Sequence, residues 1–126
     1  MPNSVRNIMG AGMPPLVAQM ASGTIADSLA ATGASQAGAL LLGTDTAVFT
    51  TVAAGTGALL PGQTVAQPGD EVVVANLGAN ALTVYPQIGG TINTLAANAG
   101  YAVPAGKVAY FIARMGALNW VAVLSA

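Results

Sequence analysis

Charged side chains are scarce in this sequence. Its 126 residues include three Lys or Arg and four Asp or Glu, and the 35 residues from 72 to 106 carry no charge. In ordinary soluble domains about a quarter of the residues are charged. A monomer normally resists association through a charged surface without large apolar patches. We therefore expect much of this surface to be covered by copies of the chain or by a larger partner, although uncharged polar side chains can also solvate a surface.

The residue types that the chain lacks exclude several functions. There is no Cys and no His, which removes disulfides, thiolate sites, the usual general base and the commonest zinc ligand. Asp70 and Glu71 are neighbours, so on a strand their side chains face opposite sides and cannot act as a carboxylate pair. Asp27 and Asp45 are isolated in the sequence. We expect no enzyme activity, no cofactor and no metal ion.

The overall charge also bears on the partners. The formal net charge is −1, so no field attracts nucleic acid or an acidic membrane surface. Gly, Pro and Asn interrupt the uncharged runs every few residues, whereas a spanning helix needs about 20 mostly apolar residues in sequence. We expect neither nucleic acid nor a membrane as a partner.

The composition changes near residue 36 and divides the chain into an arm, residues 1–36, and a body, residues 37–126. The arm is rich in Gly, Ala, Ser, Met and Pro, and "GAGMPP" cannot form a helix interior. We interpret it as an extended arm with at most one short helix after Pro15; a disordered tail is the alternative. Its side chains that we expect to contact a capsid or another copy are Val5, Arg6, Ile8, Met9, Met13, Leu16 and Met20.

The body has a β pattern. Short runs rich in aliphatic and β-branched residues alternate with turns every 6–12 residues, at 39–42, 46–53, 58–60, 71–76, 81–86, 91–93, 101–104, 107–114 and 119–126. About eight short strands at this spacing favour an all-β, jelly-roll-like sandwich. A partly open barrel is the second possibility.

Two segments of the body carry more specific expectations. Residues 69–86, "GDEVVVANLGANALTVYP", are typical of two strands joined by an Asn- and Gly-containing turn, so we expect a hairpin in which Leu82 and Val84 share one face. In "KVAYFIAR" (107–114) both faces are apolar. We expect this strand to be central in its sheet or covered on its second side.

Aromatic residues offer one possible binding site. A sugar-stacking platform on a β-sandwich formed by Trp120 with Tyr85, Tyr101 and Tyr110 is one interpretation. Core packing is the simpler interpretation for Trp120 and Tyr110.

The last 51 residues carry a resemblance. Residues 76–126 contain N-x-G-x-N, L-x-V-Y-P, G-G-x-I-N, P-A-G-K before an aromatic strand, and a final Trp strand. These motifs stand here as Asn76, Gly78 and Asn80; Leu82, Val84, Tyr85 and Pro86; Gly89, Gly90, Ile92 and Asn93; residues 104–107; and Trp120. Together they resemble a segment found in small virion proteins of tailed bacteriophages.

The resemblance implies a jelly-roll-type capsid decoration, or cement, protein. Such proteins assemble in the host cytoplasm on the outer surface of the phage head, where they oligomerise and bridge subunits of the major capsid protein, often through extended terminal arms. It implies a homo-oligomer, with a trimer favoured over a dimer, and no catalytic residues. The sequence thus predicts a structural virion protein. The alternative is a glycan- or host-surface-binding module of a phage head or tail fibre.

Overall fold

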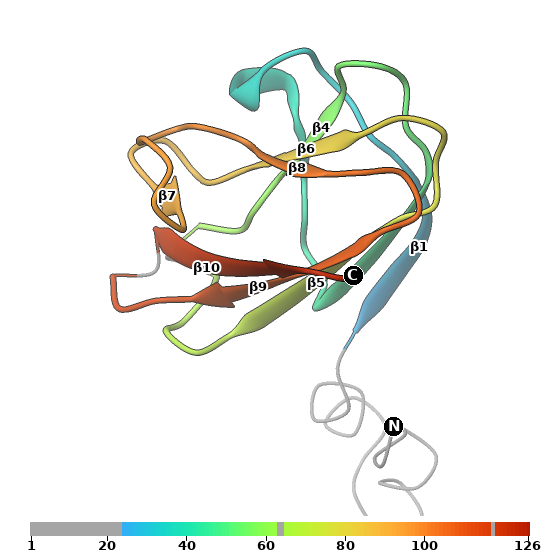
Figure 1. Cartoon of the computed structure of the whole chain (residues 1–126). Helices are drawn as coiled ribbons and strands as arrows, with labels where there is room; N and C mark the ends of the chain where they lie inside the picture. The colour runs from blue at the N-terminus through green and yellow to red at the C-terminus, as the bar shows by residue number, and fades with distance from the viewer. Residues whose placement is uncertain (1–23, 63–64, 117) are drawn as a thin grey trace, which may run out of the picture.

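The computed structural model describes residues 24–62, 65–116 and 118–126, and this part of the chain is nearly all β. Two sheets face each other as a sandwich (Figure 1). Sheet A has six strands, in the order β1 (Ile25–Ala30), β3 (Thr46–Thr51), β5 (Glu71–Asn76), β9 (Val108–Ala113), β10 (Asn119–Leu124) and β7 (Thr91–Ile92). Sheet B has four, in the order β2 (Leu40–Leu41), β4 (Gly57–Leu59), β6 (Leu82–Tyr85) and β8 (Tyr101–Val103). A single turn of 3-10 helix, Gln36–Gly38, precedes β2.

The first six strands alternate between the two sheets. Odd-numbered strands lie in sheet A and even-numbered strands in sheet B, and each strand pairs in parallel with the next one of its own sheet. The chain therefore winds as a coil, with the opposite sheet supplying the crossover that parallel strands require. The later strands close the sandwich: β8 pairs antiparallel with β6, and β9 pairs antiparallel with both β5 and β10.

The all-β sandwich is confirmed, but the jelly-roll connectivity is not. Jelly rolls are built from antiparallel strands, whereas five of the eight pairings among the described residues are parallel. The expected hairpin over residues 69–86 is wrong, because β5 belongs to sheet A and β6 to sheet B. The loop between them crosses from one layer to the other.

Asn76 explains why the chain crosses at this point. Its side chain is completely buried at the end of β5. The Nδ2 group donates to the carbonyl oxygens of Asn80 (2.8 Å) and Val103 (2.9 Å), and Oδ1 accepts from the Gly78 backbone N–H (3.0 Å). The amide therefore joins the end of β5 to its own loop and to β8 of sheet B, which holds the two layers together at the crossing.

The predicted strands of the body are confirmed, but the predicted boundary between arm and body, after residue 36, is wrong. Each predicted segment from residue 39 onward contains a strand. Residues 25–30, predicted as part of the arm, form β1 at the edge of sheet A, so the sandwich begins before residue 37. The sequence "IADSLA" has little β propensity. Its pairing with β3 makes it a strand, and the pairing is irregular, with two register shifts and a positive φ of 57° at Ser28.

The core lies between the two sheets. The shared face predicted for Leu82 and Val84 of β6 is confirmed and points inward, as do the Phe111 face of β9 and the Trp120 face of β10. The largest fully buried apolar side chains are Trp120, Phe49, Phe111, Leu60, Leu82, Ile92, Val74, Val84 and Val103. Within the part of the chain that the structure describes, no helix is long and apolar enough to cross a bilayer.

Candidate interaction surface

The acidic residues cap turns at one end of the sandwich. Asp45, Asp70 and Glu71 line a small hollow of about 70 Å³ beside Val72. Asp45 Oδ2 accepts hydrogen bonds from the backbone N–H (3.0 Å) and the hydroxyl (3.3 Å) of Thr24, and Asp70 Oδ2 accepts from the Gln67 N–H (2.8 Å). Among residues 24–62, 65–116 and 118–126, no three acidic side chains come together as a metal site would require. Asp45 and Asp70 therefore serve the local backbone.

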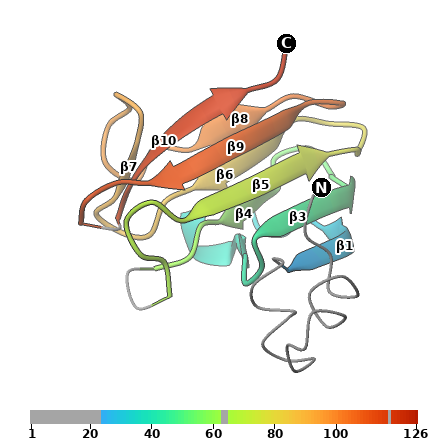
Figure 2. The ribbon, with the colours of Figure 1, turned by 90° about the horizontal axis from the view of Figure 1, so that it is seen from below.

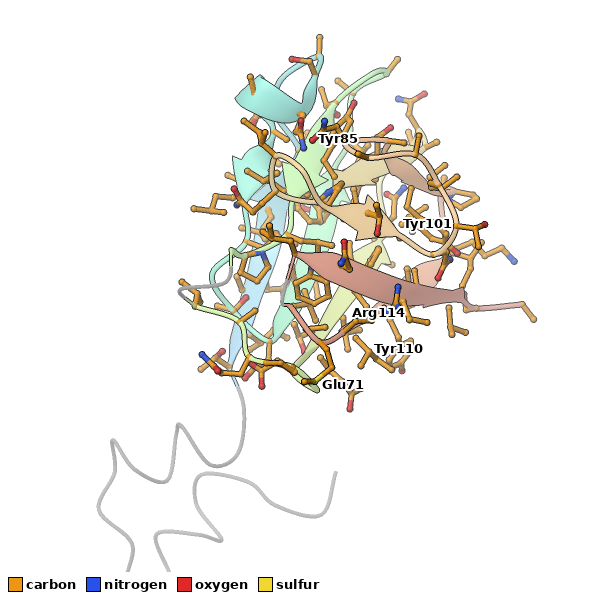
Figure 3. The ribbon with its side chains drawn as sticks, turned by 90° about the vertical axis from the view of Figure 1, so that its left-hand side faces the viewer. Glu71, Tyr85, Tyr101, Tyr110 and Arg114 are labelled. Carbon is orange, nitrogen blue, oxygen red and sulfur yellow. The ribbon has the colours of Figure 1, made fainter. Side chains whose placement is uncertain are left out.

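The aromatic side chains do not form one platform. Trp120 is confirmed in the core, where it is fully buried and its Nε1–H has no hydrogen-bond partner among the described residues. Tyr85 and Tyr101 belong to sheet B, and the Tyr101 ring packs edge-on against Phe111 with centroids 5.7 Å apart. The expectation that Tyr110 lies in the core is wrong: 46% of it is exposed on the opposite side of sheet A. Figure 3 shows Tyr110 and Glu71 below this sheet, away from Tyr85 and Tyr101.

The outer side of sheet A is the strongest candidate for a functional site. Side chains alternate along each strand, so the residues between the core positions of β3, β5, β9 and β10 all point away from sheet B. Figure 2 looks onto this side, with these strands in front. We call the apolar part of this side the outer face, and its members are Val48, Val73, Ala75, Val108, Tyr110, Ile112, Val121 and Val123; the polar residues that point the same way around it are Thr46, Thr50, Glu71 and Asn119.

Strand register makes the outer face continuous. Tyr110 stands between Val73 of β5 and Val123 of β10, and Ile112 stands opposite Val121. Val108 continues the row toward Ala75. Cross-strand neighbours of this kind have Cβ atoms about 5 Å apart, so their side chains touch and form one apolar surface.

An apolar outer face is unusual for a sheet with one side in water. Antiparallel strands with one solvated side normally carry polar residues there, yet Tyr110, Ile112, Val121 and Val123 are 46%, 38%, 40% and 58% exposed. The prediction that β9 is central is confirmed, since it lies between β5 and β10. Its second apolar side is left uncovered by the described residues.

Charges lie at the two ends of the outer face and not within it. Glu71 is opposite Ile112 at the end where Asp45 and Asp70 lie, and Arg114 follows β9 there. Lys107 precedes β9 at the other end, where its Nζ donates to the Ala126 backbone oxygen (2.7 Å). The face is thus an uncharged strip with a net acidic end, where Arg114 stands among three carboxylates, and an opposite end with Lys107.

The motif residues that carry the resemblance hold loops in place. Gly78 lies so close to β3 that a Cβ there would sit 2.7 Å from a Val52 methyl carbon. Asn93, at a positive φ of 54°, extends the pairing of β7 with β10, because Oδ1 accepts from the Ala122 N–H (2.8 Å) and Nδ2 donates to its carbonyl (3.2 Å). These motifs shape the framework and bring no reactive groups together.

The predicted contact residues of the arm lie outside the described residues. Val5, Arg6, Ile8, Met9, Met13, Leu16 and Met20 all precede Thr24, the first residue of the described part. The outer face was missed in the sequence, although the two apolar sides of "KVAYFIAR" were the signal for it. Comparison of the chain with protein-family models, curated proteins and solved structures finds no match.

Proposed function

We propose that this protein is a structural, non-enzymatic component of a bacteriophage virion, which oligomerises on the outer surface of the head and bridges subunits of the major capsid protein. The observation that carries the proposal is the outer face of sheet A, a continuous apolar strip on a chain with few charges. Exposed apolar patches of this kind mark sites of protein–protein contact. The choice of the phage capsid as the partner rests on the resemblance of residues 76–126 to small virion proteins. The jelly-roll type rests on that resemblance alone, since most of the described strand pairings are parallel.

Such a protein would bind the capsid through weak contacts that are repeated in each copy of the oligomer. Each copy would supply apolar contacts from residues 1–20 and from the body, and the cores of protein interfaces are depleted in charge. When one copy of an oligomer is bound, the others are held at a high effective concentration near their own sites. In this proposal the surface carries few charges because much of it is buried in protein contacts.

Removal of the arm tests the proposal. We expect a chain lacking residues 1–20 to keep the far-ultraviolet circular dichroism and the melting transition of the full chain, because those residues precede β1. It should fail to co-sediment with phage heads that lack the protein, whereas the full chain should saturate them. A full-length variant with Met9 and Met13 both changed to Leu keeps the apolar character and serves as the matched control. Equal occupancy of heads by the truncated and full chains would contradict the proposal.

The glycan-binding alternative loses its main support. Trp120, the residue best suited to stack on a sugar ring, is fully buried, and the tyrosines lie on different sides of the molecule. No other grouping among the described residues favours a sugar site over a protein interface.

A further inference from the structure

We infer that two copies of this chain pair through the outer face of sheet A, with the two-fold axis lying between the faces and running across the strands. The inference deepens the proposed function, because it assigns the self-association that the proposal requires to one surface. A face that packs against its own copy forms an isologous interface, which closes at two subunits. It therefore predicts a dimer as the basic unit in place of the trimer expected from the resemblance.

The size of the outer face suits a weak dimer. Strands of six residues at about 3.3 Å each are about 20 Å long, and four strands about 4.8 Å apart span about 14 Å between the axes of the outer strands, or about 19 Å with the width of those strands included. With its rim, the face covers roughly 500 Å² per copy, so a pair would bury roughly 1,000 Å² in total. This value is at the lower limit for a specific interface, and we expect a dissociation constant in the range of about 1 to 100 μM.

The shape of the face also suits another sheet. Its members are mostly Val, with Ile112 and the larger Tyr110 between them, and β-branched side chains on a sheet give an even, rigid surface. Two such sheets pack about 10 Å apart with their strands within about 30° of each other. Tyr110 is the natural anchor, since tyrosine is enriched among the residues that dominate interface energies.

The charges at the rim decide between the two possible axes. If the axis ran along the strands, the end of one copy that carries Asp45, Asp70, Glu71 and Arg114 would oppose the same end of the other, and both are net negative because Arg114 offsets only one of the three carboxylates. If the axis runs across the strands, the acidic end with Glu71 faces the end with Lys107. Opposite charges favour an encounter and like charges oppose it, so the second arrangement is selected.

Sedimentation of the full chain over about 1 to 500 μM tests the interface. We expect a monomer–dimer equilibrium and a loss of at least tenfold in association for Tyr110→Lys and for Val123→Lys, both at exposed positions of the face. Met115→Lys is the matched control, because Met115 is 82% exposed in the turn between β9 and β10, outside the face. Circular dichroism melts establish that each variant is folded. A wild-type chain that stays monomeric at 500 μM, a trimer, or face variants that associate as well as the control would each overturn the inference.

A charge swap tests the direction of the axis. We expect Glu71→Lys and Lys107→Glu each to weaken association about tenfold, since each change creates two like-charged pairs per dimer, and the double variant to restore it. If Glu71→Lys alone strengthens the dimer, the axis runs along the strands and this part of the inference is wrong. Binding to phage heads distinguishes the dimer from the proposed capsid partner. If the wild-type chain is monomeric and still binds heads through its arm, the dimer is refuted and the capsid partner is retained.

Discussion

Replacement of Asn76 by Ala should remove a large share of the stability of this fold. The side chain is fully buried and makes three hydrogen bonds, two as donor to the Asn80 and Val103 carbonyls and one as acceptor from the Gly78 N–H. These bonds join β5, the crossing loop and β8. The bond to the Val103 carbonyl is buried.

The expected loss of stability is the sum of the costs for the three backbone groups that lose their hydrogen bond to Asn76. The buried Val103 carbonyl loses its partner outright, and an orphaned buried group costs about 1–3 kcal/mol. The Asn80 carbonyl and the Gly78 N–H are only partly buried, so water can replace part of each bond, at a cost of about 0.5–1.5 kcal/mol apiece. We therefore expect Asn76→Ala to lower the free energy of unfolding by about 4 kcal/mol, from a total that for a domain of this size is about 5–15 kcal/mol.

Urea denaturation followed by circular dichroism measures the change. Asn80→Ala is the matched control, since that side chain makes one hydrogen bond, from Nδ2 to the Val52 carbonyl (2.9 Å), and should cost about 1 kcal/mol. Asn76→Asp keeps the shape of the side chain but turns its two donor contacts into repulsion between oxygens, so at neutral pH it should cost at least as much as Asn76→Ala. A loss below about 1 kcal/mol for Asn76→Ala, or an Asn76→Asp variant as stable as the wild type, would show that the amide does not hold the crossing.

Two further predictions concern the packing of the sandwich. A Cβ at Gly90 would overlap the carbonyl oxygen of Leu118, so Gly90→Ala should lower the free energy of unfolding by more than about 2 kcal/mol, measured from the denaturation midpoint. Gly43 has nothing within 4 Å of the position of a Cβ, so the control Gly43→Ala should stay within about 0.5 kcal/mol of the wild type. Equal effects of the two substitutions would be inconsistent with the close approach at Gly90. Trp120, the only tryptophan of the chain, is fully buried, so its fluorescence should be blue-shifted and resistant to acrylamide until the protein unfolds. Ready quenching in the native state, or a response to added sugars, would contradict its place in the core.

The strands were predictable from the sequence because their signal is local. In β6 and β9 the alternation of residues along the strand indicates two faces, and in β6 the structure turns the face with Leu82 and Val84 inward. For β9 both faces are apolar, so only the position of sheet B decides that Phe111 points inward and Tyr110 outward.

Strand pairing was not predictable in the same way. The Asn-Gly loop after β5 has the residues of a hairpin turn, yet its Asn76 side chain bonds across to Val103 and leads the chain into the other sheet. The edge strand β1 was missed because its sequence has no strand signal and depends on β3 for its conformation. Parallel pairing joins segments about 20 residues or more apart, as Ile25 with Thr46, and nothing in either segment alone records its partner.

The edges of the two sheets have a consequence for how the molecule can grow. A coil of parallel strands is open at its ends, and repeat proteins of this kind need caps to prevent them from stacking without limit. Here β1 is broken by two register shifts and carries Asp27, while the other outermost strands, β2, β7 and β8, are two or three residues long. Short, irregular or charged edges are poor templates for a further strand. Edge-to-edge polymerisation into fibres is thereby disfavoured in a chain with so little charge, and the broad side of sheet A is left as the surface for the association that we propose.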